Sequence, residues 1–415
     1  MMKNSPSAFG QDTAERPIKA AYSRRSFDRV PTRTEARALL QQLASEDCLA
    51  APVSPDAPLV IYGAGNFGRM ALDFLRDVGV EALMVVDARA DQISGSDAWA
   101  GIDLRAPHEV PEHVKSSALL AVSVVTSPVL PILEELQAQG WKRCVPFYDV
   151  AESFRPAHPL SNGWFAEPLS VSDLEAVGAG LDAWGDDLSR AHHLMFLAWR
   201  LARQEWRFDG VAVDNSNRFF IPEVLDVLRQ DDLFLDGGAH HGSVAQAYLA
   251  ANGQESRIVA FEPDEVNAGQ FAAWRASQPA PVRERIELRR DALDAMSRDR
   301  RFHGGLGYIS QLTGHGPASI VTRTIDAAGL EPGFVKLHLE GGELDALKGG
   351  IATLKRSRPV VAVTVYHDAD GLWRTARWMR ENLKDYVLLM RTHSWCGTGA
   401  VIYALPRERM PEAVN

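Results

Sequence analysis

The sequence predicts an α/β protein with two doubly wound, Rossmann-like units joined by a helical connector. Two glycine-rich turns carry this prediction, because each follows a short apolar run and precedes a helical stretch and a second apolar run. Strand, glycine turn, helix, strand is the order of a nucleotide-binding βαβ unit. Further apolar runs separated mostly by helical stretches extend the second unit and indicate a mainly parallel sheet.

Composition is typical of a soluble globular protein of two or three domains. Of the 415 residues, 46% are hydrophobic and 24% charged, and no segment approaches the roughly 20 uninterrupted apolar residues of a membrane span. The net charge of -10 argues against nucleic acid as the main partner. Three widely separated cysteines indicate neither a disulfide framework nor a zinc ribbon, and they favour a reducing cytoplasm.

Residues 1–56 are interpreted as a lead-in and a helix. Met1 to about Arg33 mixes Ser, Pro, Arg and Lys without the apolar stretch of a secretory signal, so we expect it to be disordered. A helix is expected from Thr34 to about Ser45, ahead of a proline-rich linker that ends it.

Residues 57–150 are predicted to form a small Rossmann-like unit. Its pattern consists of the run Leu59–Tyr62, the glycines Gly63, Gly65 and Gly68, and the run Ala82–Val86 followed by Asp87. Such glycines let the backbone approach a pyrophosphate at a helix N-terminus, and Asp87 is placed to accept hydrogen bonds from ribose hydroxyls. The unit is therefore a candidate second site for NAD or a nucleotide sugar, although similar turns also occur in units that bind nothing.

A helical connector, residues 151–230, leads to the last unit. It is rich in Trp and Arg, and Ser170 followed by Asp173 resembles a helix N-cap. The last unit spans residues 231–406 and is followed by a tail, residues 407–415. Its strand-like runs are Asp232–Asp236, Arg257–Phe261, Arg285–Leu288, Phe334–Leu339, Val360–Val365, Tyr386–Met390 and Val401–Ala404.

The strongest local signal is the glycine loop that opens the last unit. The loop residues expected to bind a cofactor are Asp236, Gly237, Gly238, Ala239 and Gly242. About 25 residues further on, a second strand ends in Glu262, which is placed to bind the ribose hydroxyls of an adenosine. Asp291 follows the third strand, where related folds contact adenine, and we assign it to cofactor binding as well.

These motifs resemble those of the FkbM-type methyltransferase family. Besides the loop and the Phe-Glu-Pro at Glu262, the run from Lys336 to Glu343 is similar to the family's Lys-x-Asp-x-Glu-Gly-x-Glu, with His338 in the place of the usual acid. The resemblance covers residues 231–406. It implies an S-adenosylmethionine-dependent enzyme that methylates an oxygen of a sugar, glycan or natural product, with a possible place in polysaccharide biosynthesis.

Methyl transfer to oxygen needs alignment and a base, and the candidates lie at strand ends. We take His338, Glu340 and His367 as catalytic candidates, because a neutral imidazole can act as a base near pH 7. Ordinary hydrogen-bonded roles are the alternative for the histidines, and Glu343 fits helix capping as well as catalysis. The pairs His240–His241 and His192–His193 have no further ligands at zinc spacing, so we predict no metal site.

Two other functions remain open at this point. One is an oxidoreductase or nucleotide-sugar enzyme that uses the small unit, although no Tyr-x-x-x-Lys follows Asp87. The other is a non-catalytic protein that senses ligands. The sequence names neither the methyl acceptor nor the oligomeric state, and it does not decide between attack by oxygen and by nitrogen.

Overall fold

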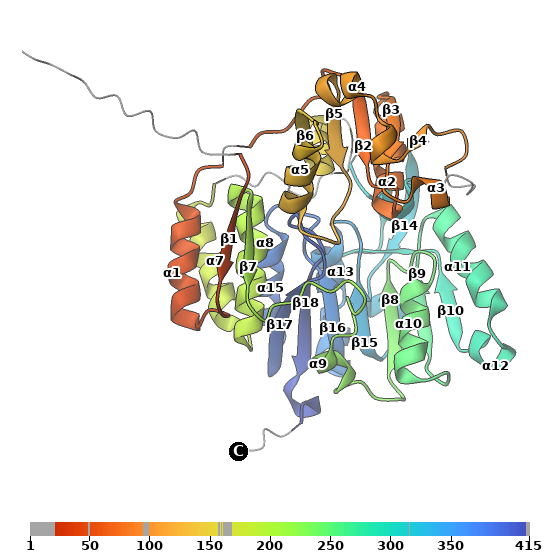
Figure 1. Ribbon diagram of the computed structural model, residues 1–415. Coiled ribbons are helices and arrows are strands. Elements are labelled where there is room, and N and C mark those ends of the chain that lie inside the picture. Colours follow the sequence, from red (N-terminus) through yellow and green to blue (C-terminus); the bar gives the residue numbers. More distant parts are fainter. Residues whose placement is uncertain are drawn as a thin grey trace, which may run out of the picture.

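A computed structural model describes residues 21–48, 50–93, 99–156, 158, 160, 168–314 and 316–411. Its two main sheets lie one above the other, with a group of helices along one side (Figure 1). The architecture is the α/β fold with Rossmann-like sheets that the sequence predicts.

The larger sheet has seven strands and holds the predicted cofactor loop. In sheet order they are β10 Ile286–Arg289, β9 Ile258–Phe261, β8 Leu233–Gly237, β15 Pro332–Leu337, β16 Val360–Thr364, β18 Ala400–Pro406 and β17 Tyr386–Thr392. Only β18 runs antiparallel to its neighbours, so the prediction of a mainly parallel sheet is confirmed. The carboxyl ends of the parallel strands consequently meet along one edge.

Alternate residues of the central strands face two separate cores. Leu235 and Val335 pack into one core, whereas Phe234 and Phe334 pack into the other. This two-sided burial explains why the strands are apolar without interruption. The surrounding helices are α10 Ser243–Asn252, α11 Glu265–Ser277, α12 Ala280–Arg283, α13 Glu343–Gly349, α14 Ile351–Ser357 and α15 Gly371–Asn382.

The smaller sheet is entirely parallel. Its order is β4 Leu104–Arg105, β3 Ala82–Val86, β2 Leu59–Tyr62, β5 Leu119–Val122 and β6 Arg143–Pro146. The helices that follow its strands are α2 Asn66–Asp77, α3 Ala90–Ile93, α4 Glu112–Ser117, α5 Val129–Ala138 and α6 Phe147–Ala151. Strand β2 and the glycine turn after it form as the apolar run and the glycines predict.

The described residues of the connector form helices and one strand. It contains α7 Val171–Ala183, α8 Asp187–Ala202, β7 Gln204–Phe208 and α9 Pro222–Leu225. Ser170 accepts a hydrogen bond from the Asp173 amide, and the Asp173 side chain accepts one in return, which confirms the predicted N-cap.

The expected disordered lead-in is wrong for residues 21–33, whereas residues 1–20 lie outside the described residues. Strand β1, Ser23–Phe27, pairs in parallel with β7, and helix α1, Arg33–Ala44, follows it. Just before β1, the hydroxyl of Tyr22 bonds to the carboxylate of Asp149, which also contacts Arg203 at 3.4 Å. Arg203 and Asp149 are fully buried, so this ionic contact ties the start of the described chain to α6 and to the end of α8.

A third sheet of four short strands lies between β10 and β15 in the sequence. It consists of β11 Ala292–Leu293, β14 Ala318–Arg323, β12 Asp299–His303 and β13 Gln311–Leu312. We call this sheet and its loops, residues 292–323, the flap. Sequence analysis did not predict it.

The two main sheets face each other through the carboxyl ends of their strands. Beyond β5, the Val125 carbonyl accepts a hydrogen bond from the Trp395 amide, which lies between β17 and β18. One face of α2 and the loop from His240 to His241 line a shared cleft. Within the described residues, no helix has the length and apolar character needed to cross a membrane.

Candidate functional site

The cofactor loop can form only with glycine at Gly238. Its φ is +75°, and a Cβ added there would lie 2.0 Å from the carbonyl oxygen of His338. At Gly242 φ is +91°, and an added Cβ would lie 2.6 Å from the Trp274 ring. The loop therefore packs bare backbone against β15 and α11, and it leaves room above the ends of β8 and β9.

Asp236 supports the loop from below rather than facing the cavity. It is fully buried, and its Oδ1 lies 2.8 Å from the Nζ of Lys336 in β15. The same ammonium group donates to the carbonyls of Gly238 at 2.7 Å and Gly237 at 3.2 Å. Sequence analysis quoted Lys336 within a motif without giving it a role, and it is the cation that holds the loop to the sheet.

Glu262 lies at the carboxyl end of β9, as predicted, and faces the cavity. Its Oε2 accepts a hydrogen bond from the His240 amide at 2.8 Å, and its Oε1 accepts one from the Asp264 amide at 3.0 Å. Burial raises the pKa of this carboxyl above its ordinary value, although the two amides act in the opposite direction. The two backbone bonds fix the carboxylate in one orientation.

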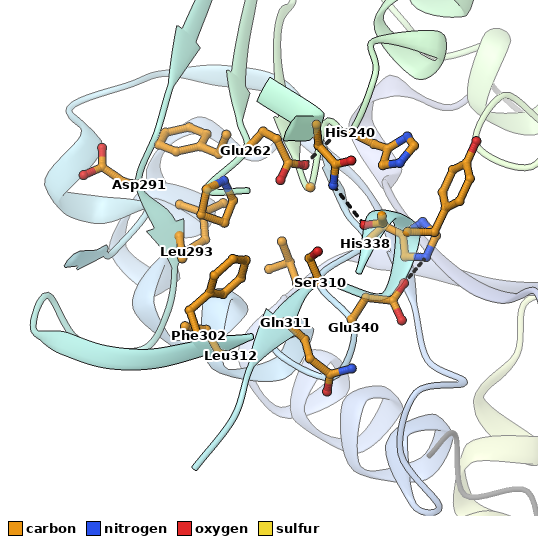
Figure 2. A pocket seen from close by; sticks show the side chains of 18 residues that line it. His240, Glu262, Asp291, Leu293, Phe302, Ser310, Gln311, Leu312, His338 and Glu340 are labelled. Atoms are coloured by element: carbon orange, nitrogen blue, oxygen red, sulfur yellow. Dashed lines mark hydrogen bonds and ion pairs between the residues drawn. The ribbon is translucent and has the colours of Figure 1, made fainter. Parts of the chain in front are cut away.

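A cavity open to solvent runs along the carboxyl ends of β8, β9 and β15. Figure 2 shows Asp291 at one end, His338 and Glu340 at the other, and Glu262 between them. The side chains that sequence analysis missed come mainly from the flap and α11: Asn267, Phe302, Tyr308, Ser310, Gln311 and Leu312. The cavity thus combines apolar side chains, among them Phe302 and Leu312, with polar groups.

Of the other predicted cofactor residues, some shape the cavity and some lie behind it. An added Cβ at Gly237 would lie 2.8 Å from Leu337, so this glycine serves packing within the sheet. Ala239 is buried among apolar side chains. Asp291 borders the cavity, but its carboxylate is held by Arg323 at 2.9 Å and points away from the centre in Figure 2.

The three catalytic candidates lie together, and two of them, His338 and Glu340, line one end of the cavity. His338 and Glu340 follow β15, and His367 follows β16. The Oε1 atom of Glu340 lies 3.1 Å from Nε2 of His338 and 3.3 Å from Nε2 of His367. We call these three residues the cluster. Among the described residues it is also the group of three metal-ligand side chains whose ligand atoms lie within 4.8 Å of one another.

Glu343 joins the cluster to the first turn of α13. Its Oε1 accepts hydrogen bonds from Nδ1 of His367 at 2.6 Å and from the hydroxyl of Thr364 at 2.9 Å. Its two oxygens also accept from the amides of Leu339 and Gly341. The side chain therefore does cap the turn before α13, and it orients His367 as well.

The charges of the cluster follow from burial and from the pairing of unlike groups. Burial lowers the pKa of His338 to about 4, so this imidazole is neutral at pH 7. Burial also opposes a charge on His367, but Glu340 and Glu343 together raise its pKa well above the ordinary value. In return His367 outweighs burial and lowers the pKa of both glutamates. The cluster is a charged, internally paired group.

The backbone around His367 is held by a buried arginine of the connector. The guanidinium of Arg200 donates to the carbonyls of Tyr366, Asp368 at 3.1 Å and Gly397 at 3.0 Å. The hydroxyl of Tyr366 lies 3.1 Å from Nε2 of His338. Helix α8 thus positions the loop that carries His367.

The second candidate nucleotide site has the expected turn, but its carboxylate is engaged. Gly63 has φ of +104°, and an added Cβ at Gly68 would lie 1.8 Å from the Gly63 carbonyl oxygen, whereas Gly65 has open space. The carboxylate of Asp87 accepts hydrogen bonds from the amides of Ala64 at 2.7 Å and Arg89 at 2.8 Å. This arrangement parallels that of Glu262, whose carboxylate also accepts hydrogen bonds from two backbone amides.

The other histidine pairs have packing partners. His192 bonds to Thr392 and His193 to Trp184, and both are buried in α8. The ring of His240 stacks between His241 and Tyr308 at the mouth of the cavity.

Comparison with known proteins gives a family for the large sheet. Residues 236–388 match the model of the methyltransferase FkbM domain. The crystal structure of methyltransferase FkbM from Methylobacillus flagellatus KT is similar over 90% of this chain and 94% of its own, with 17% identity and a TM-score of 0.57. That similarity is one of fold and includes both sheets. No curated protein gave a significant match.

Two further solved structures match a smaller part of the chain. Precorrin-6y C5,15-methyltransferase from Geobacter metallireducens covers 44% of this chain and 83% of its own, with 18% identity and a TM-score of 0.28. Fibrillarin from Aeropyrum pernix, solved with natively bound S-adenosyl-L-methionine, covers 43% and 68%, with 11% identity and a TM-score of 0.29. The match to the methyltransferase FkbM domain thus falls on the large sheet and the flap.

Proposed function

We propose that the protein is an S-adenosylmethionine-dependent methyltransferase that acts on a hydroxyl group of a sugar, glycan or natural product. The observation that carries the proposal is one cavity that joins the glycine loop and Glu262 to His338 and Glu340. A cofactor site and a group able to act on an acceptor thus share one space.

The cavity suggests how the cofactor lies. Glu262 accepts hydrogen bonds from the ribose hydroxyls, and the methionine part passes over the bare backbone of Gly238. Leu293 and Phe302 would border the adenine, at the end of the cavity where Asp291 lies. His338 and Glu340 would then line the end of the cavity where the methyl group is transferred.

An oxygen acceptor fits the chemistry of that end. The acceptor oxygen forms a bond to the methyl carbon while the carbon–sulfur bond breaks and its electron pair stays on sulfur, giving S-adenosylhomocysteine. The hydroxyl must also lose its proton, and the cluster is the charged and basic group beside it. Alignment of the three reacting atoms supplies most of the rate enhancement.

The rest of the assignment follows from the fold. We propose residues 57–150 as an accessory Rossmann-like domain, residues 151–230 as the connector and residues 231–406 as the methyltransferase domain. The accessory domain borders the mouth of the cavity through α2 and is a candidate site for NAD or a nucleotide sugar. The three free cysteines support a reducing, cytoplasmic setting.

Calorimetric titration of S-adenosylmethionine tests the proposal. We expect wild-type protein to bind it, Glu262→Ala to lose binding, and Glu265→Gln to bind as wild type, because Glu265 is an exposed carboxylate at the start of α11. Sugars and lipid-linked glycans are then screened as acceptors by release of S-adenosylhomocysteine. If wild type does not bind S-adenosylmethionine, the proposal fails, and binding of NAD alone would move the active site to the small unit.

A further inference from the structure

The ends of two neighbouring strands bring three metal-ligand side chains to one point. The Nε2 atoms of His338 and His367 lie 3.1 and 3.3 Å from the same oxygen of Glu340. Two ligands that are each about 2.1 Å from one ion, at tetrahedral or octahedral angles, are separated by roughly 3.0–3.4 Å. Both distances to Glu340 therefore match the spacing of a coordination shell, and all three ligand atoms lie within 4.8 Å of one another.

The second buried imidazole has a ring nitrogen aimed at the same place. Nε2 of His367, in a side chain that is 3% exposed, makes no hydrogen bond of good geometry, and its contact is Oε1 of Glu340 at 3.3 Å. The other ring nitrogen, Nδ1, is bonded to Glu343 at 2.6 Å. In proteins a metal-binding histidine almost always has its second nitrogen bonded to a carboxylate, carbonyl or water in this way.

The backbone at Glu340 fits a functional role. Its φ of +51° is uncommon for a residue other than glycine. Among the described contacts of its carboxylate, both partners are the histidines of the cluster. The chain thus adopts an unfavourable conformation at the residue that would bridge the two imidazoles.

We propose that His338, Glu340 and His367 bind a divalent transition-metal ion, such as Zn²⁺, Mn²⁺ or Fe²⁺. Two imidazoles favour these ions over Mg²⁺ and Ca²⁺, which prefer oxygen ligands. Three protein ligands leave at least one position open, and His338 and Glu340 turn that position toward the cavity.

The catalytic consequence rests on the proposed function, whereas binding of the ion does not. An acceptor hydroxyl that takes the open position has its pKa lowered by the ion and loses its proton to solvent. Its oxygen then forms the bond to the methyl carbon, and the electron pair of the broken carbon–sulfur bond remains on sulfur. The ion would orient the acceptor as well as activate it.

Titration of metal-stripped protein with Co²⁺ tests the proposal, because Co²⁺ reports its ligands by visible absorption. We expect wild type to bind one equivalent. His367→Gln and Glu340→Gln should weaken binding by about 100-fold or more, and Glu343→Gln by about 10- to 100-fold, as is usual for the partner of a ligating histidine. His113→Gln, at an exposed histidine of α4, is the matched control and should bind Co²⁺ as wild type.

X-ray absorption of wild-type protein loaded with Zn²⁺ gives a result that needs no variant, and it should find two imidazoles on the ion. Absence of stoichiometric Co²⁺ binding, unchanged binding in folded His367→Gln and Glu340→Gln, or an ion without imidazole ligands would each overturn the proposal. Titration of S-adenosylmethionine separates the two hypotheses. If the protein binds Co²⁺ but not S-adenosylmethionine, the metal site stands and the proposed function fails. If it binds S-adenosylmethionine but not Co²⁺, the proposed function stands and the metal site fails.

Discussion

Replacing Lys336 with methionine should lower the free energy of unfolding by much more than the loss of an exposed charge would. The side chain of Lys336 is 1% exposed, and its ammonium group is the partner of Oδ1 of Asp236, whose Oδ2 has no hydrogen-bond partner. In Lys336→Met the carboxylate would therefore stay buried with neither oxygen paired. Removing one partner of a buried ion pair costs about 3–5 kcal/mol, a large part of the roughly 5–15 kcal/mol that stabilises a domain.

The double variant Lys336→Met/Asp236→Leu should recover most of that loss. Both charges are then absent, and only the hydrogen bonds to the carbonyls of Gly237 and Gly238 are missing, at about 1 kcal/mol each. We expect the double variant to lie about 1–2 kcal/mol below wild type. Lys348→Met is the control, because Lys348 is an exposed lysine whose pair with Asp345 contributes less than about 1 kcal/mol.

Urea unfolding followed by circular dichroism measures these differences. The reasoning is refuted if Lys336→Met loses no more stability than Lys348→Met. It is also refuted if the double variant is as unstable as the single one, since the unpaired carboxylate would then not be the cause.

Three other predictions concern the loop, a buried histidine and the support of the cluster. Gly238→Ala should weaken S-adenosylmethionine binding at least about 10-fold, because the positive φ and the nearby His338 carbonyl would force the loop to move. Gly269→Ala is the control, since an added Cβ there meets open space. Equal affinity in the two variants would contradict the prediction. Burial lowers the pKa of His193 to about 3, below the ordinary 6.5, so the unfolded chain takes up the proton first as pH falls. The free energy of unfolding should therefore decline below pH 6.5. In His193→Gln, urea unfolding should give a slope of this free energy against pH that is smaller by up to about 1.4 kcal/mol per pH unit. An unchanged slope would exclude this histidine as the cause. Arg200→Lys should lower kcat about 10- to 100-fold, because His367 would be displaced. The Kd for S-adenosylmethionine, measured by calorimetry, should stay unchanged. A change in Kd alone would count against the positioning role.

The fold was predictable where strands are apolar and not where they are polar. Strand β2 coincides with its predicted run. Strand β15 begins and ends two residues before the run predicted for it, Phe334–Leu339. By contrast β1, with the sequence Ser-Arg-Arg-Ser-Phe, and β12, with Asp-Arg-Arg-Phe-His, carry no apolar alternation. These strands form because a neighbouring strand satisfies their backbone groups, which local sequence does not report.

The site divides in the same way. Glu262 could be placed from its distance to the glycine loop, because the βαβ unit fixes that spacing. The proximity of His338, Glu340 and His367 could not be predicted, since it depends on β15 and β16 being neighbours in the sheet. A search for metal ligands at local spacing misses such a group, and it equally misses Arg200, which acts from another part of the chain.

The contact of Tyr22 with Asp149 and Arg203 bears on how the protein can be divided in the laboratory. These residues belong to stretches far apart in sequence, and two of them carry opposite charges without access to water. A shortened version that starts at residue 30 would omit Tyr22 and β1, and a version limited to residues 231–406 would also discard α8 with Arg200. Each such fragment would bring interior surface into contact with water, so crystallisation and labelling studies should retain the chain from residue 21 onward.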